Sequence, residues 1–258
     1  MGFPAVPTLP AVAIERPWKI DAVMMLGAGL MICLSAGTFA NIGLKALLAE
    51  LAPGQQRFAS FLMSTASFQL AGLLLVHSFL KAHEAGWREF LGVADNRFQH
   101  AIAISVGVAV LAVPLALGLN SLSEWILTQI QGGAAMQPTM QALEATEGAL
   151  QRGIFAFAAI ILAPLIEETL FRGILYRTGQ QLGYPRLALF GSSLLFAVIH
   201  ASLLTLLPLT VLAIIFARLY DYTGRLIAPI VAHSLFNSIN LIAYLYREEL
   251  TQWFERLT

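Results

Sequence analysis

The chain has 258 residues, of which 58% are hydrophobic and only 12% charged, with a formal net charge of zero and a mean hydropathy of +0.74. A soluble domain of this length carries about twice that charged fraction, so the composition excludes an ordinary soluble enzyme. The zero net charge gives no electrostatic basis for binding nucleic acid. A single cysteine, Cys33, excludes a disulfide framework and a thiol metal cluster. We therefore expect a polytopic membrane protein.

Residues 1–19 form a segment with four prolines and no basic region ahead of a short apolar core. Proline fixes its own backbone angle and lacks an amide donor, which disfavours regular structure. A cleavable signal peptide also needs a basic region followed by an apolar core. We predict an extended N-terminal tail rather than a signal peptide.

Seven apolar segments follow, each near the ~20 residues that a helix needs to cross a bilayer. They lie at residues 20–44, 58–80, 101–127, 152–176, 187–203, 207–222 and 226–246. The sixth is the weakest, although Pro208 suits the start of a helix. The sequence predicts an all-α transmembrane bundle of about seven spans, with one membrane domain over residues 20–246 and a C-terminal tail at 247–258.

The segments between the spans indicate how the chain is oriented. Residues 81–100 are polar enough to lie at the membrane interface, with Trp87 and Phe90 in the headgroup layer. Residues 129–148 read as an exposed, flexible loop with a Gly-Gly turn. With a cytoplasmic N-terminus, ten of the 15 Lys and Arg residues fall on the cytoplasmic side. We expect an integral protein of a bacterial inner membrane with its N-terminus in the cytoplasm.

Three predicted spans carry ionisable groups at similar depth. An ionisable residue at mid-membrane costs several kcal/mol and is a functional-site hypothesis by default. The fourth span contains Glu167, Glu168 and Arg172, the fifth contains His200 and the seventh contains His233. At ~1.5 Å per residue, Glu168, His200 and His233 lie about 18, 22 and 12 Å from the cytoplasmic turns. All three depths fall inside a ~30 Å hydrocarbon core.

Helical spacing separates the two glutamates. Glu168 and Arg172 are four residues apart, so they share a face and can pair. Glu167 points ~100° away, which leaves it free to act as a general base. The alternative is that both carboxylates are structural, although one ion pair leaves the second buried acid unexplained. His233 and Asn237 also share a face, and Asn237 could donate to an oxyanion or link two helices.

Other motifs are absent from the chain. It contains no H-E-x-x-H, no G-x-S-x-G and no glycine-rich phosphate loop, so zincin, serine-hydrolase and nucleotide-binding functions lack their motifs. His77, His83 and His100 lie at or beyond the ends of spans, where solvation accounts for them. The candidate site is therefore confined to the last three polar-bearing spans.

The three patterns E-E-x-x-x-R, F-x-x-x-H and H-x-x-x-N, in this order, resemble the CPBP family of CAAX prenyl endopeptidases and bacteriocin-processing proteins, also called the Abi family. The resemblance covers about residues 150–245 and every motif position is filled. The matching residues are Glu167, Glu168, Arg172, Phe196, His200, His233 and Asn237. The first 150 residues contribute only generic spans.

The resemblance implies an intramembrane endopeptidase whose site is enclosed by a helical bundle. In CAAX-processing relatives the first glutamate and the histidine of the second motif are taken to activate a water, which here implies Glu167 and His200. The third motif would hold the oxyanion through His233 and Asn237. The second glutamate and the arginine would stabilise the site.

The family is also called metalloprotease, and the residue types leave a metal open. Glu167, His200 and His233 would make a two-histidine, one-carboxylate zinc set with water in the fourth position. Asparagine is a poor zinc ligand, which fits an oxyanion role for Asn237 better. We expect metal-independent chemistry and keep zinc as the alternative.

The expected partners are membrane lipid and a protein or peptide substrate near the membrane, without nucleic acid. A non-catalytic membrane scaffold or chaperone-like protein that keeps the same fold is the main alternative function. A transporter with a proton relay is a second alternative, against which the chain shows no inverted repeat and no paired broken helices.

Overall fold

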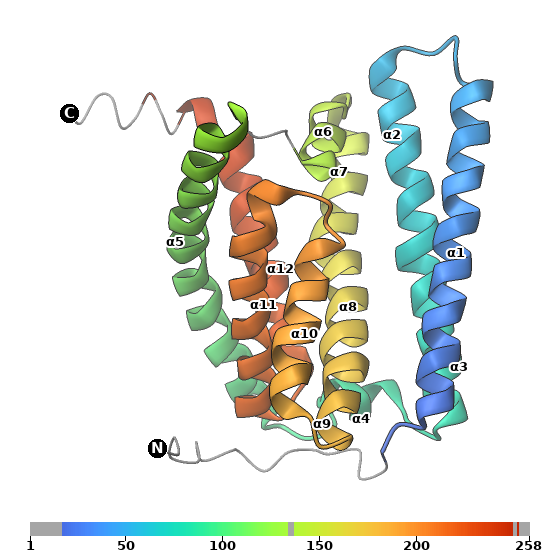
Figure 1. Ribbon diagram of the computed structural model, residues 1–258, viewed down its shortest axis with the longest axis vertical. Coiled ribbons are helices and arrows are strands. Elements are labelled where there is room, and N and C mark those ends of the chain that lie inside the picture. Colours follow the sequence, from blue (N-terminus) through green and yellow to red (C-terminus); the bar gives the residue numbers. More distant parts are fainter. Residues whose placement is uncertain (1–16, 134–136, 250–251, 253–258) are drawn as a thin grey trace.

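The computed structural model describes residues 17–133, 137–249 and 252. All regular structure in this part of the chain is helical, and Figure 1 shows the long helices side by side in one bundle. Six helical segments are long and apolar enough to cross a membrane, and one shorter apolar helix accompanies them. This confirms the predicted all-α bundle of about seven spans. Most of both predicted tails lies outside the described residues.

The first half of the chain forms a hairpin of two long helical segments, followed by a third long helix. Its elements are α1 (Ile20–Leu47), α2 (Pro53–Ser64), the π-helical η1 (Thr65–Leu70), α3 (Ala71–Ala82), α4 (Trp87–Leu91), α5 (Phe98–Gln131) and α6 (Pro138–Glu144). The segments α2, η1 and α3 run on as one candidate span, Pro53–Ala82. In Figure 1 the hairpin of α1 with α2 and α3 stands on one side of the bundle and α5 on the other.

The second half carries the predicted site. Its elements are α7 (Gly148–Phe157), the π-helical η2 (Ala158–Leu162), α8 (Ala163–Glu168), the π-helical η3 (Thr169–Tyr176), α9 (Arg177–Gln181), α10 (Pro185–Val198), α11 (Leu203–Thr223) and α12 (Ile227–Leu245). The first five are continuous and form one candidate span, Gly148–Gln181. A wider π-helical segment therefore lies on each side of α8, the short α-helical segment that contains both glutamates. Such segments are frequent at functional sites.

The fifth and sixth predicted spans are wrong in their bounds. The fifth helix, α10, stops at Val198, and Ala201 in the following turn has φ +50°, a left-handed angle that a helix cannot contain. The sixth helix, α11, begins at Leu203, so Pro208 lies inside it rather than at its start. As a result α11, not α10, has the length of a full span. The α10–α11 hairpin turns back at a lower level than the ends of α1, α2 and α5 (Figure 1).

The predicted loop at 129–148 also contains more structure than expected. Gly132 and Gly133 adopt φ +79° and +149°, which agrees with the expected Gly-Gly turn. Beyond the undescribed residues 134–136, however, α6 forms and buries Ala142 and Leu143 against Phe155 of α7. The apolar residues of α6 explain why a helix forms where a loop was predicted. In the sequence they stand among polar residues, so they did not indicate a buried helix.

A hydrophobic core fixes the glutamate-bearing span against the N-terminal hairpin. Ile166, between the two π-helical segments, is fully buried in a cluster with Leu30 of α1 and Val76 of α3. Gly72 permits this approach, since a Cβ atom there would lie 3.0 Å from the Cδ1 of Ile166. Small residues at helix contacts are the usual way to bring membrane helices together. The core therefore holds α8 on a face that is turned away from Glu168.

Phe90 does not project outward toward the lipid headgroups, as was predicted. It is 5% exposed and its ring lies 6.0 Å from that of Trp18. The glycine at position 173 makes room for it, since a Cβ atom there would come 2.5 Å from the Cζ of Phe90. Trp18 also donates its indole N–H to the carbonyl of Gly173 at 2.9 Å. Phe90 is thus part of the core, whereas Trp87 stays at the surface of α4 and is partly buried.

A buried arginine fixes the start of α12, the helix that carries His233. Arg225 is 3% exposed; its guanidinium donates to the carbonyl of Gly92 and to both carboxylate oxygens of Asp95, the latter at 2.8 and 2.9 Å. These contacts tie the α4–α5 connection to the α11–α12 turn. The hydrogen bonds from Arg225, together with the backbone N–H of Arg97, lower the pKa of Asp95 below its ordinary value of 3.8.

The lowered pKa of Asp95 predicts a pH dependence of stability. Because folding favours the ionised carboxylate, its contribution is present above the ordinary pKa and is lost as the pH falls through the lowered one. We expect the unfolding temperature of the purified protein to fall between about pH 5 and pH 2 by more in the wild type than in Asp95→Asn. Asp21→Asn, an exposed control, should keep the wild-type profile. Parallel profiles for wild type and Asp95→Asn would contradict the prediction.

Candidate active site

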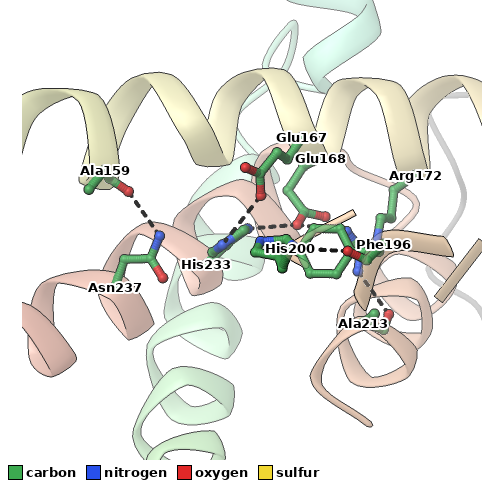
Figure 2. A network of polar contacts seen from close by, with 9 residues as sticks. All are labelled: Ala159, Glu167, Glu168, Arg172, Phe196, His200, Ala213, His233 and Asn237. Carbon is green, nitrogen blue, oxygen red and sulfur yellow. Dashed lines mark hydrogen bonds and ion pairs between the residues drawn. The ribbon is translucent and has the colours of Figure 1, made fainter. Parts of the chain in front are cut away.

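Glu168 is the centre of a buried polar network. Its side chain is fully buried at the end of α8. One oxygen, Oε1, accepts from Nη1 of Arg172 at 2.9 Å and from Nδ1 of His233 at 2.8 Å, as Figure 2 shows. Arg172 also donates from Nη2 to the carbonyl of Ala213 at 3.0 Å. The network therefore joins the fourth span to α11 and to α12.

Arg172 keeps its charge away from water by using aromatic faces as well as hydrogen bonds. Its side chain is 2% exposed. The guanidinium carbon lies 4.7 Å from the ring centre of Phe196 and 5.7 Å from that of Phe216, within the range of a cation–π contact. A carboxylate, a carbonyl and two rings thus surround the cation. A buried ion pair needs such additional contacts to offset its desolvation.

Glu167 is the more accessible of the two glutamates, with a side chain 13% exposed. Its Oε2 lies 3.9 Å from Nε2 of His233. Because the Glu168 carboxylate only accepts, Nδ1 of His233 carries a proton, and a neutral ring then turns a lone pair at Nε2 toward Glu167. A proton on either Nε2 or Glu167 removes this repulsion. The two side chains therefore lie close enough for a small movement to bring them into hydrogen-bond contact.

His200 lies in the turn after α10 and is partly buried. Its Nδ1 is 2.7 Å from the carbonyl of Phe196, which can only accept, so Nδ1 carries a proton and Nε2 of the neutral ring is free to act as a base. No hydrogen bond or ion pair within the described ranges joins His200 to Glu167, the partner that the family resemblance implies.

Phe196 is the residue whose role the sequence did not reveal. It is fully buried, and its ring centre lies 4.8 Å from that of His200 and 5.9 Å from that of His233. On the other side it contacts Arg172 (Figure 2). One side chain thus fixes the positions of residues from all three motifs. The F-x-x-x-H pattern marked Phe196 as a motif residue, but it did not predict that its ring contacts the other two motifs.

Asn237 lies one helical turn beyond His233. Its Nδ2 donates to the carbonyl of Ala159 in η2 at 2.8 Å, so the amide links α12 to the fourth span (Figure 2). This is the helix-linking contact that the sequence left open. The amide has a second N–H, which makes no hydrogen bond to the described residues. The predicted oxyanion role requires that second donor.

The three residues considered as zinc ligands do not form a ready-made metal set. The described residues contain no group of three or more His, Cys, Asp or Glu side chains placed to hold a metal ion. Glu167 and His233 are 3.9 Å apart, and His200 contacts neither by a polar interaction. Binding zinc through all three would require them to approach one another.

The segment that holds this network has recognisable relatives. A family model described as Type II CAAX prenyl endopeptidase Rce1-like matches residues 150–239. This range includes all six predicted site residues and confirms the resemblance inferred from the three motifs. With the six apolar candidate spans, it indicates an integral membrane protein.

Two curated proteins are similar to this chain. The membrane-embedded CAAX protease MroQ of Staphylococcus aureus is 30% identical over 147 residues, which is 55% of this chain and 59% of the relative. The "Putative membrane peptidase YdiL" of Bacillus subtilis is 35% identical over 85 residues, which is 33% of this chain and 35% of the relative. The chain thus spans less than two thirds of either relative's length. No solved structure matches it.

Proposed function

We propose that this protein is an intramembrane endopeptidase that hydrolyses a peptide bond of a membrane-associated protein or peptide. The observation that carries the proposal is the position of Glu167, which lies 3.9 Å from His233 in a chain of apolar spans. Beside it, Glu168 and Arg172 form a buried ion pair. An acid–base pair next to a fixed charge pair is an arrangement suited to activating water. The similarity to a CAAX protease and to the endopeptidase family supports the same class of reaction.

In the proposed mechanism Glu167 removes a proton from a water molecule, and the resulting hydroxide attacks the carbonyl carbon of the substrate. His200 orients this water through its free Nε2. His233 donates from Nε2 to the developing oxyanion, and because its Nδ1–H is held by Glu168, the donating form is the imidazolium. Asn237 supplies the second donor through its unused N–H.

The proton taken by Glu167 then passes to the nitrogen of the leaving amine, which completes hydrolysis and returns Glu167 to its ionised form. Arg172 and Glu168 do not touch the substrate in this scheme. Arg172 holds Glu168 in place, and the Glu168 carboxylate in turn positions His233 and stabilises its positive charge. Burial strengthens each of these interactions, because water does not screen them.

We also propose that the chain lies in a bacterial inner membrane with its N-terminus in the cytoplasm. The α3–α4, α9–α10 and α11–α12 connections lie at the same end of the bundle as the start of α1 (Figure 1). Basic residues lie in or within two residues of these connections, and one directly precedes α1: Lys81, Arg88, Arg186, Arg225 and Lys19. This supports a cytoplasmic location for this end.

The test compares peptide termini in the membrane fraction of cells that express the wild type or Glu167→Gln at equal level. New termini that appear only with the wild type identify both the reaction and the substrate. Glu50→Gln, a control at an exposed position before α2, should produce the same termini as the wild type. Identical termini in all three samples would overturn the peptidase proposal and favour the scaffold alternative.

A further inference from the structure

A groove outside the glutamate network lies where α3 ends and α4 begins. It has a volume of about 350 Å³ and is lined by His77, Leu80, Lys81, Glu84, Ala85, Gly86 and Trp87. The candidate span Pro53–Ala82 ends inside this set, so the groove is at the depth where lipid headgroups meet the hydrocarbon core. None of its residues takes part in the proposed mechanism.

Two donors one helical turn apart point to the kind of ligand that the groove can hold. Trp87 donates its indole N–H to Nδ1 of His77 at 3.1 Å. Nδ1 is therefore the acceptor of this ring, and the proton of the neutral imidazole is on Nε2. Lys81 lies four residues further along the same helix, is exposed, and makes no ion pair within the described part of the chain. Each of the two side chains can thus donate to an anion.

We propose that this groove binds the phosphate ester of a membrane phospholipid, through the ammonium group of Lys81 and Nε2–H of His77. The side of the Trp87 ring would contact the glycerol and the upper acyl chain, which is the usual position of tryptophan at a membrane interface.

The inference does not depend on peptidase activity, and the purified full-length chain tests it directly. Native mass spectrometry would count bound dioleoylphosphatidylglycerol as its concentration is raised. We expect Lys81→Gln to weaken this binding about five-fold, the usual effect of one basic residue near an anionic membrane surface. His77→Phe, which keeps a ring but removes the Nε2 donor, should also weaken it. Arg186→Gln, an exposed change at the start of α10 away from the groove, should leave it unchanged.

Two further ligands separate the possible sources of binding. Dioleoylglycerol, which lacks the phosphate, should not occupy the site, and its equal retention would overturn the proposal. Equal losses in Lys81→Gln and Arg186→Gln would also overturn it, because they would show a diffuse charge effect. Competition by glycerol 3-phosphate supports the same phosphate site with a soluble ligand as its source. Absence of competition supports the lipid as the source.

Discussion

Replacing Arg172 by methionine is expected to lower the free energy of unfolding by about 3–5 kcal/mol. The substitution leaves the fully buried Glu168 carboxylate without its cation, and only the hydrogen bond from His233 remains to it. Methionine retains much of the packing against Phe196, so loss of volume is a small part of the expected effect. The largest part is the uncompensated charge, which a low-dielectric interior penalises strongly.

A double-mutant cycle separates the charge from the packing. Unfolding in detergent would be measured for Arg172→Met, for Glu168→Gln and for both changes together. We expect the double variant to be more stable than Arg172→Met alone, because a neutral amide no longer requires a cation. Arg218→Met is the matched control: its ion pair with Asp221 is on the surface, with the arginine 64% exposed, and its loss should cost no more than about 1 kcal/mol. A double variant less stable than either single one would contradict the charge explanation.

The sequence could predict the Glu168–Arg172 contact because both residues lie on one helix, where spacing alone sets the geometry. It could also predict that His200 and His233 share a depth with the glutamates, since a helix rises by a constant amount per residue. The contact of Arg172 with the carbonyl of Ala213 could not be predicted in this way. Every residue has a backbone carbonyl, so the residue types do not show which carbonyl the arginine contacts. That depends on how α11 packs against the fourth span.

The errors in the helix bounds have a similar cause. Pro208 suggested a helix start on local preference, but a proline is tolerated inside an apolar membrane helix when its neighbours satisfy the freed carbonyl. The end of α10 depends on the left-handed turn at Ala201, a residue type that rarely adopts this angle. Neither feature could be read from hydropathy. The consequence is functional, because the early end of α10 places His200 in a turn rather than on a helix.

Glu167 and His200 are expected to behave as one unit if together they activate the water. With a peptide containing the cleavage site found in cells, Glu167→Gln should lower the rate of hydrolysis by about 10²–10⁴, the usual contribution of a general base. His200→Asn should lower it by a comparable factor. The double variant should be no slower than the worse single variant, because residues that act in one step are strongly non-additive.

The same cycle tests the geometry directly, because the structure places Glu167 beside His233 and shows no polar contact between Glu167 and His200. If the effects of Glu167→Gln and His200→Asn multiply, while those of Glu167→Gln and His233→Asn do not, then His233 is the acid–base partner and His200 has a separate role. Repeating the wild-type assay with a chelator decides the zinc alternative in the same experiment. Loss of activity that returns on adding zinc would require Glu167, His200 and His233 to move together during the reaction, since the described conformation does not gather them into one ligand set.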